Sequence, residues 1–371
     1  MKFNIQSKLL LQHLQAVSKV VNSKNTLAIL DNFLFNLEGD KLIVTGSDQE
    51  TTLTSAVQVT EAEGNGKFAA NVKRMLDLLK ELPDLGLSFN INDENLEIDI
   101  RHQNGHSHFI GVNGNEFPAK APSEEEQSVL TLPVQKVVEG LQHTIFAVGT
   151  ESLRPMMMGV YWDIKPTEIA FVATDTHKLV RYKQQNLAID IEKSFILPTK
   201  PATILASVLE KKEGDVTISF DSKGATFQTE DYTLSCRFIN SRYPNYNSVI
   251  PQDNQYEVNV DRATLLSAIK RVSVFSSPGG LVKLQLAANS LVMTTQNIDF
   301  STSAEEKVQC EYDGVEMTIG FNDSSIIDVL NNINSESVTI KLLDPSRAGL
   351  FLPSEQKEGE DLLVLLMPMM I

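Results

Sequence analysis

The fold is decided by the segment Lys2–Val21, which reads KFNIQSKLLLQHLQAVSKVV. In Phe3–Ile5 the apolar side chains alternate with a polar one, as they do in a strand that buries one face. Leu10, Leu14 and Val17 then follow at helical spacing, so they form one apolar stripe on a helix. The segment therefore predicts a short strand that leads directly into an amphipathic helix.

The same strand–helix motif occurs twice more in the chain. The second copy begins at Leu130–Leu132 and the third at Val258–Val260, and their helical positions are Val137, Leu141 and Thr144 in the second copy and Leu265, Ile269 and Val272 in the third. Equivalent helical positions are 127 residues apart in the first two copies and 128 residues apart in the last two. A constant long period of this kind indicates an internal structural repeat.

Other landmarks keep the same order in each repeat. Gly46–Asp48 corresponds to Ala173–Asp175 and more loosely to Thr294–Gln296, Phe68 corresponds to Phe195, and each repeat closes on a bulky residue and a proline, at Phe117-Pro118, Tyr243-Pro244 and Met367-Pro368. We therefore predict three similar domains, over residues 1–121, 128–250 and 251–371, with Ser123–Gln127 as an acidic linker after the first domain.

Each repeat has the pattern of an α+β unit with antiparallel sheets and two helices. Asn32–Leu37 and Lys41–Thr45, joined by a Glu-Gly-Asp turn at 38–40, predict a hairpin. Ser7 and Asp261 suit helix N-caps. Strands outnumber helices and rarely alternate with them, which favours antiparallel sheets. The six predicted helices with their flanks are residues 7–24, 71–82, 133–148, 199–212, 261–275 and 323–333.

The composition excludes several classes of protein. The 371 residues are 42% hydrophobic and 22% charged, as in an ordinary globular protein, and the net charge of −16 argues against a generally basic nucleic-acid-binding surface. Cys236 and Cys310 are too few for a disulfide framework or a four-ligand zinc site, which favours reduced thiols in a cytoplasmic protein. No signal-peptide pattern begins the chain, and the longest apolar run, Leu362–Ile371, is too short to span a membrane.

Positive charge is concentrated in the predicted helices. The six segments contain 13 basic and 7 acidic residues, so they hold six excess positive charges while the rest of the chain holds 22 excess negative ones. On the first helix Lys8, Gln12, Gln15 and Lys19 form a polar stripe beside the apolar one. An ordinary solvated face explains one such stripe, whereas segregation over several helices indicates a surface that faces a polyanion. The sixth helix has no Lys or Arg, so the segregation is incomplete.

Three segments resemble the motifs of one family. Ala173–Leu179 (ATDTHKL) resembles the A-T-D-G-H-R-L signature of bacterial sliding clamps, the β subunits of DNA polymerase III. Arg242–Tyr246 (RYPNY) resembles their R-[FY]-P-[DN]-Y segment, and Met367–Met369 resembles their M-P-[MIV] segment. The order and spacing of these motifs extend the resemblance over the whole chain. The sequence departs from the family at Thr176, where glycine is usual, and at Lys178, where arginine is frequent.

The resemblance implies a fold and a function. The fold is three similar DNA-clamp domains per subunit, with antiparallel sheets outside and two helices inside each domain, and two subunits closing head to tail into a ring. The function is that of a processivity factor without catalytic activity, cofactor or metal. Such a ring encircles double-stranded DNA of any sequence. It tethers the polymerase III alpha subunit, the clamp loader and other proteins with clamp-binding motifs during replication.

The charge pattern and the resemblance together assign three sets of residues. The DNA-facing set is Lys8, Lys19, Lys24, Lys73, Lys200, Arg262 and Lys270. The dimer interface joins Arg74 and Phe109 of one subunit to Val274, Phe275 and Asp299 of the other. The partner-peptide pocket contains Met157, Thr174, Thr176, His177, Lys178, Leu179, Pro244, Val249, Leu365, Met367, Pro368, Met369 and Met370. The unbroken apolar run at 365–371 also indicates this pocket, because a strand buries only alternate side chains and the others need a second apolar neighbour.

Two other classes of function compete with this interpretation. Asp175 and His177 could belong to a nucleophile–base arrangement, but no G-x-S-x-G, P-loop, G-x-G-x-x-G or H-E-x-x-H motif accompanies them. His102, His106 and His108 could bind a metal adventitiously, although an exposed strand is the simpler interpretation. A repeat-built interaction scaffold would explain the acidic surface but not the basic helices. The sequence therefore favours a sliding clamp.

Overall fold

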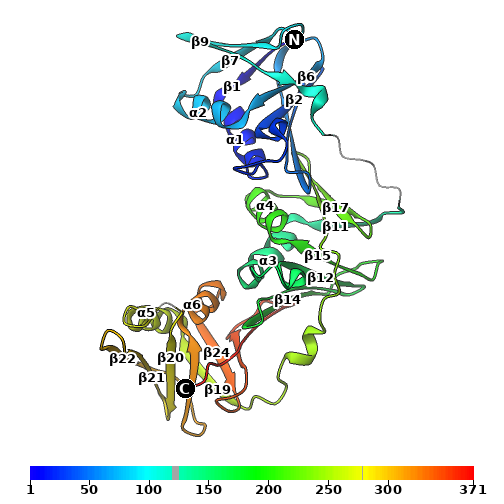
Figure 1. The fold of residues 1–371 in the computed structure, drawn as a ribbon. Coiled ribbons are helices and arrows are strands. Elements are labelled where there is room, and N and C mark those ends of the chain that lie inside the picture. The colour runs from blue at the N-terminus through cyan, green and yellow to red at the C-terminus, as the bar shows by residue number, and fades with distance from the viewer. Residues whose placement is uncertain (119–124, 278) are drawn as a thin grey trace. The chain divides into compact units, whose positions relative to one another are not determined.

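The computed structural model describes residues 1–118, 125–277 and 279–371 (Figure 1). The predicted end of the first domain, residue 121, lies outside the described residues, and so do Ser123 and Glu124 of the predicted acidic linker. The predicted domain limits stay a prediction, because the compact units of the structure divide the chain at other positions.

The chain forms two compact units, each described by itself. The first contains Met1–Gln135 and Thr203–Phe238, and the second contains Lys136–Ala202 and Ile239–Ile371. Two of the three boundaries fall inside α3 (Val134–Gln142) and α4 (Thr199–Leu209), and the third lies between Phe238 and Ile239. The second repeat therefore contributes strands to both units.

The first unit contains all described residues of the first repeat and four strands of the second. Its other elements are β1 (Lys2–Gln6), α1 (Ser7–Ser18), β2 (Asn32–Glu38), β3 (Lys41–Ser47), β4 (Thr51–Gln58), β5 (Thr60–Glu63), β6 (Gly66–Asn71), α2 (Val72–Glu81), β7 (Gly86–Ile91), β8 (Glu97–His102), β9 (Gly105–Ile110), β10 (Val112–Asn113), β11 (Ser128–Pro133), β16 (Asp215–Phe220), β17 (Gly224–Gln228) and β18 (Tyr232–Arg237).

The second unit contains the remaining strands of the second repeat and the whole third repeat. Its other elements are β12 (Gly159–Lys165), β13 (Glu168–Thr174), β14 (Lys178–Gln185), β15 (Lys193–Pro198), β19 (Tyr256–Asp261), α5 (Arg262–Ser273), β20 (Leu281–Ala287), β21 (Ser290–Asn297), β22 (Thr302–Gln309), β23 (Met317–Asn322), α6 (Asp323–Asn332), β24 (Ser337–Leu342), β25 (Gly349–Pro353) and β26 (Glu360–Leu366).

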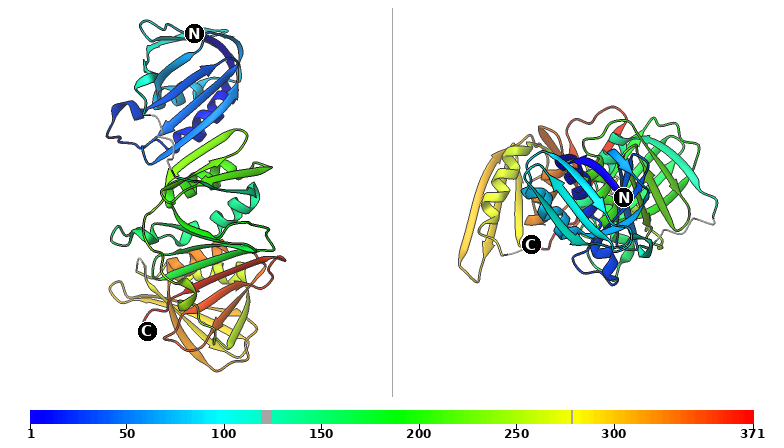
Figure 2. Two further views of the ribbon diagram at one scale, coloured as in Figure 1. Left: turned by 90° about the vertical axis from the view of Figure 1, so that its right-hand side faces the viewer. Right: turned by 90° about the horizontal axis from the view of Figure 1, so that it is seen from above.

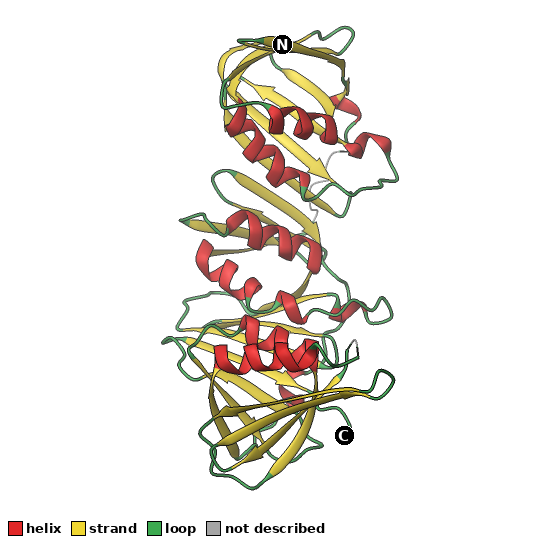
Figure 3. Ribbon diagram, turned by 90° about the vertical axis from the view of Figure 1, so that its left-hand side faces the viewer, coloured by secondary structure: helices red, strands yellow, loops and turns green. Residues whose placement is uncertain are grey.

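Two antiparallel sheets with packed helices make up each unit. The strand orders are β5-β1-β7-β8-β9 and β10-β6-β2-β3-β4-β18-β17-β16-β11 in the first unit, and β15-β12-β13-β14-β26-β25-β24-β19 and β22-β21-β20-β23 in the second. The helix α1 packs against α2 and strands β1 to β4, and α5 packs against α6 and strands β19 to β22. Figure 3 shows the helices lying against the sheets, as the predicted α+β fold of three similar domains requires.

The repeated strand–helix motif is confirmed in all three copies. The strands β1, β11 and β19 lead into α1, α3 and α5, and they pair with β7, β16 and β24, the first strands after the second helix of each repeat. Every position that the motif names, from Phe3 in the first copy to Val272 in the third, is buried. The predicted hairpin at 32–45 is the β2–β3 pair. Periodicity alone therefore identified the elements that build each core.

One of the two predicted N-caps is correct. The Asp261 carboxylate accepts a hydrogen bond from the backbone N–H of Thr264 at 2.7 Å and caps α5. The prediction for Ser7 was wrong, because Ser7 is the first residue of α1 and lies buried. Its hydroxyl donates to the carbonyl of Pro83 at 2.8 Å and accepts from the N–H of Leu85 at 3.1 Å, so it ties the start of α1 to the loop after α2.

The β3–β4 and β13–β14 turns have the same construction, as the matched sequence segments predicted. In each turn the aspartate Oδ1 accepts hydrogen bonds from the backbone N–H groups two and three residues later, at 3.0 and 2.7 Å from Asp48 and at 2.9 and 2.8 Å from Asp175. The next residue has a positive φ in both turns, 79° at Gln49 and 81° at Thr176. Glycine adopts this conformation without strain, which explains why the family prefers glycine where this chain has Thr176.

The longest sheets form because strands of neighbouring repeats pair with each other. In the first unit β4 pairs with β18, and in the second unit β14 pairs with β26, both antiparallel. Figure 2 shows the red strand β26 beside the green strand β14 in its left-hand view. The corresponding strand of the third repeat, β22, and the last strand of the first repeat, β9, each lie at the edge of a sheet.

Candidate functional sites

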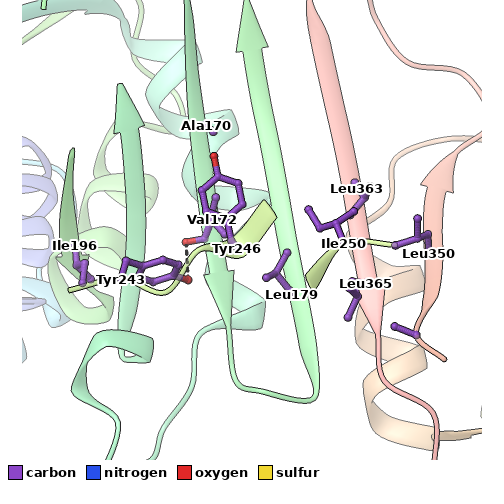
Figure 4. Packing of buried hydrophobic residues seen from close by; sticks show 11 residues of the cluster. Ala170, Val172, Leu179, Ile196, Tyr243, Tyr246, Ile250, Leu350, Leu363 and Leu365 are labelled. Atoms are coloured by element: carbon purple, nitrogen blue, oxygen red, sulfur yellow. Dashed lines mark hydrogen bonds between the residues drawn. The ribbon is translucent and has the colours of Figure 1, made fainter. Parts of the chain in front are cut away.

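The RYPNY segment packs on the sheet where the second and third repeats meet (Figure 4). Tyr243, Tyr246 and Ile250 join a buried cluster on β13, β14, β25 and β26 that includes Leu179 and Leu365, two residues predicted for the partner-peptide pocket. Sequence reasoning did not assign the two tyrosines to this place. The signal available was the pair of aromatic residues in one short loop, since large aromatic side chains are rarely left in solvent.

The tail segment Met367–Ile371 extends from β26 between two neighbours. The N–H of Met367 donates to the carbonyl of His177 at 2.8 Å, and the N–H of Met369 donates to the carbonyl of Gly320 at 2.8 Å. A Cβ atom on Gly320 would lie 3.2 Å from the carbonyl oxygen of Met369, so glycine permits the close approach of the tail to β23. These bonds hold the tail between the β13–β14 turn and β23.

Apolar surface remains exposed around the tail. Met367 is 43% exposed, Met369 is 36% exposed and Met370 is 99% exposed, and Val249 on the RYPNY side is 56% exposed. Pro244 is also exposed. The expected alternation is wrong for β26, because Leu362–Leu366 are all buried, and exposure begins only where the strand ends, at Met367. The methionines of the tail form an exposed apolar surface of the kind that receives an apolar ligand.

The polar residues of the predicted pocket hold the β13–β14 turn in shape. The Lys178 ammonium lies 2.8 Å from Asp175 and 3.9 Å from Asp328 of α6, and its side chain is almost fully buried. The hydroxyl of Thr174 donates to the carbonyl of Lys178 at 2.8 Å. Because the Asp175 carboxylate is engaged by Lys178 and by the backbone of the turn, the structure gives no support to a catalytic pair of Asp175 and His177.

The loop before β12 brings Met157 to the same turn. The short helix η4 (Pro155–Met157) is fixed by a hydrogen bond from the N–H of Gly149 to the carbonyl of Met157 at 2.8 Å. A Cβ atom on Gly149 would lie 3.3 Å from Met157 Cβ and 3.4 Å from Asp175 Cα, so the loop and the turn are in contact. Thr176 and His177 are exposed beside them.

The predicted DNA-facing residues differ in their surroundings. Lys8, Lys19, Lys24, Lys73 and Lys270 are exposed, whereas Lys200 is half-buried. The ammonium of Lys19 donates to the hydroxyl of Ser207. The Arg262 guanidinium donates to the carbonyls of Leu330 at 3.0 Å and Ser335 at 2.9 Å, so this residue also stabilises the end of α6. The lysines on α1 and α2 lie on helices that pack together in the first unit.

The predicted interface residues lie beside the two sheet edges. In the first unit the Arg74 guanidinium stacks 5.5 Å from the centre of the Phe109 ring, on the edge strand β9. In the second unit Val274 is 76% exposed, and Phe275 and Asp299 are also exposed, near the start of the edge strand β22.

Sequence reasoning missed three further apolar side chains at these edges. They are Ile110 on β9 and Ile298 and Phe300 before β22, and all three are largely exposed. A pattern of alternation did not reveal them, because exposure at an edge depends on which strands remain unpaired.

A polar cavity of about 550 Å³ in the second unit was not expected from the sequence. Lys136 and Lys357 each lie 3.7 to 4.0 Å from both Glu139 and Glu360, and burial raises the pKa of the Tyr182 hydroxyl next to them. This network ties α3 to β26. The lining residues are Glu139, Gln142, His143, Tyr182, Asn331, Asn332, Asn334, Pro353, Glu355, Gln356, Lys357, Glu360 and Leu362.

Among residues 1–118, 125–277 and 279–371, no group of three or more His, Cys, Asp and Glu side chains is placed to hold a metal ion. Within the same ranges no helix has the length and apolar character needed to cross a membrane.

Comparisons with known proteins agree along the whole chain. Family models of the DNA polymerase III beta subunit match residues 1–120 as the N-terminal domain, 131–245 as the central domain and 247–370 as the C-terminal domain. The chain is 28% identical to a beta sliding clamp of Pseudomonas aeruginosa over all of both chains, and 26% identical to that of Bacillus subtilis over 94% of this chain and 95% of the relative. A crystal structure of the DNA polymerase III subunit beta from Pseudomonas aeruginosa, 27% identical, superposes with a TM-score of 0.91 and full coverage of both chains.

Proposed function

Because this chain belongs to the DNA polymerase III beta subunit family and is a DNA sliding clamp of replication, we propose that two copies close head to tail around duplex DNA and tether replication proteins to it. In this proposal the protein is a cytoplasmic accessory subunit of the polymerase III holoenzyme with no catalytic activity of its own. Its residues act by enclosing DNA and by offering a docking surface.

The observation that carries the proposal is the pair of unfilled sheet edges. Among the described residues, β9 pairs on one side with β8 alone and β22 pairs on one side with β21 alone. Between neighbouring repeats of one chain the equivalent strands are paired antiparallel, β4 with β18 and β14 with β26. We call these two strand pairs the filled junctions. A contact between β22 of one copy and β9 of a second copy would complete both edges. Since the two contacting surfaces differ, the contact is heterologous, and two copies joined this way form a closed ring if the rotation closes.

Exposed apolar side chains support this contact. Val274 and Phe275 beside β22 would cover the half-buried Phe109 on β9, and a monomer would leave both patches in water. Replacing Val274 and Phe275 together by alanine should therefore give monomers in light scattering, with an unchanged circular dichroism spectrum. A variant that stays a dimer would place the interface elsewhere. Deletion of the tail segment Met367–Ile371 is the control, and that variant should remain a dimer.

The charge distribution supports DNA held by enclosure. With a net charge of −16 the protein cannot cover many phosphates, and the exposed lysines of α1, α2 and α5 supply only a weak positive lining. Such a lining centres the duplex through water and ions. Retention should therefore depend on the topology of the DNA and should resist salt that abolishes ordinary phosphate binding.

The experiment that tests the function follows from this topology. Clamp loaded onto nicked circular DNA should stay bound through gel filtration at high salt, and cutting the circle once with a restriction enzyme should release it. Loss from circular and linear DNA at equal rates would refute enclosure, whatever the affinity measured at low salt.

The tail and the β13–β14 turn support a docking site for partner peptides. The exposed methionines Met367, Met369 and Met370 can repack around different apolar side chains, as a site with several partners requires. We expect the polymerase III alpha subunit, the clamp loader and other clamp-binding proteins to insert one or two Leu or Phe side chains here. Each fully buried anchor would contribute about 1.5–3 kcal/mol. The exposed polar residues Thr176 and His177 of the β13–β14 turn would receive a glutamine of the same segment.

A further inference from the structure

The two junctions between repeats share one strand register, which can be counted from the residue before each second helix. These residues are Asn71 before α2, Pro198 before α4 and Asn322 before α6. A row of paired residues crosses four strands in each repeat and starts two residues before the residue just named. The rows are Ala69–Leu34–Thr45–Thr54 in the first repeat, Ile196–Tyr161–Val172–Arg181 in the second and Gly320–Lys283–Thr294–Glu305 in the third. Thr54 of β4, Arg181 of β14 and Glu305 of β22 therefore occupy equivalent positions.

The opposite strands are counted from the middle residue of the repeated motif. That residue is Asn4, Thr131 or Asn259. From that residue, the residues paired across successive strands are Asn4–Ser88–Arg101–His106 in the first repeat, Thr131–Thr217–Gln228–Thr233 in the second and Asn259–Thr339–Leu352 in the third. Phe351 lies opposite Val364, so the same register places Leu352 opposite Leu363 and completes the third row. His106 of β9, Thr233 of β18 and Leu363 of β26 therefore occupy equivalent positions.

Both filled junctions join these equivalent positions directly. Thr54 lies opposite Thr233, and Arg181 lies opposite Leu363. We infer that the unfilled edges close in the same register, so that Glu305 of one subunit lies directly opposite His106 of the other and makes ring closure sensitive to protonation. This inference rests on the proposed head-to-tail dimer and adds to it a fixed register and a regulating pair.

The groups around His106 determine the sign of this effect. On its own sheet His106 lies opposite Arg101, and the neighbouring His108 lies opposite Asp99 with its Nδ1 atom 3.4 Å from the carboxylate. These neighbours are present in the separate subunit and in the ring. Closure places Glu305 directly opposite His106 and diagonal to His108. It also places Lys307 diagonal to His106. The nearest new group is thus an acid, and its attraction outweighs the diagonal lysine.

Histidine changes its charge between about pH 5 and 8. A positive His106 gains Glu305 as a partner only in the closed ring, so the subunits should associate more tightly at pH 6 than at pH 8. A directly opposed charge pair on a sheet surface should change the association by about two- to five-fold at each junction. Both junctions break when the dimer dissociates, so the effect on the dissociation constant is the product of the two.

A disulfide test measures the register. In the β4–β18 junction, the backbone N–H of Ala56 donates to the carbonyl of Asp231 at 3.1 Å, so these two residues form a hydrogen-bonded pair. Hydrogen-bonded and non-hydrogen-bonded pairs alternate along antiparallel strands. Leu53 and Leu234, three residues away, therefore form a non-hydrogen-bonded pair. The equivalent row across the subunits is Ala304 opposite Ser107. Its Cα atoms should be about 4.5 Å apart, within reach of a disulfide. Ala304→Cys combined with Ser107→Cys should therefore cross-link two subunits under mild oxidation.

Matched controls shift the register by two residues. Ser107→Cys with Thr302→Cys, or with Glu306→Cys, separates the Cα atoms by about 8 Å and should not cross-link. The native Cys236 and Cys310 are buried and stay in every variant. Cross-linking of a shifted pair in preference to the Ala304 pair would overturn the register.

A double-mutant cycle tests the regulating pair. The dissociation constant is measured by sedimentation at pH 6 and pH 8 for the unaltered chain, His106→Gln, Glu305→Gln and the double variant. The tightening at pH 6 should be reduced in each single variant, and the second change should add nothing to the first. An equal pH response in all four proteins would refute the role of the pair. A monomer at every concentration would instead refute the proposed dimer, so the two failures are distinguishable.

Discussion

Thr176 lies in a backbone conformation that its side chain disfavours, and replacing it by glycine should stabilise the second unit. Its φ of 81° is in the left-handed region, where a residue with a Cβ atom is strained by about 1–2 kcal/mol. Glycine removes this strain but loses about 0.5–1 kcal/mol through the greater freedom of the unfolded chain. The Thr176 side chain is exposed, so little packing is lost. The net gain should be about 1 kcal/mol.

Calorimetric unfolding of Thr176→Gly measures this gain. An increase of about 1 kcal/mol should raise the melting temperature of the unit by about 2–4 °C. Thr176→Ala is the matched control, because it shortens the side chain but keeps the Cβ atom, and it should melt close to the unaltered protein. If the alanine variant gained as much as the glycine variant, the strain would lie in the side chain rather than in φ. A glycine variant that melted lower than the unaltered protein would refute the reasoning.

Three further predictions concern other parts of the chain. Deleting Met367–Ile371 should abolish binding of a fluorescent clamp-binding peptide, and unchanged affinity in the titration would place the docking site elsewhere. Arg262→Ala should destabilise the protein by about 1–3 kcal/mol, because two carbonyls at the end of α6 lose a charged donor, whereas the exposed Lys270→Ala should change chemical unfolding by less than about 0.5 kcal/mol. Burial lowers the pKa of His13, whose Nδ1 atom lies 2.5 Å from the hydroxyl of Ser55. A lowered pKa in the folded state means that stability is fully present above about pH 6.5 and falls as the pH decreases below it, so thermal melts at pH 7.5 and 5.5 should differ less for His13→Gln than for the unaltered chain.

The sequence was sufficient for the local elements and for the repeat. Strand alternation in Phe3–Ile5 and helical spacing from Leu10 to Val17 depend only on neighbours along the chain, so the same pattern could be found at three places. The motifs Ala173–Leu179 and Arg242–Tyr246 indicated the family for the same reason, since each is a short continuous segment whose turn geometry needs particular residues in order.

Only the tertiary structure decided which surfaces remain open. That Ile110, Ile298 and Phe300 are exposed follows from β9 and β22 having no further partner strand within the described residues, and pairing between distant strands leaves no local pattern. The packing of Tyr243 and Tyr246 over two repeats, and the second role of Arg262 at the end of α6, depend on contacts between segments about 70 residues or more apart. Sequence periodicity determines what a segment buries, whereas the register and the free edges depend on which strands meet after the chain has folded.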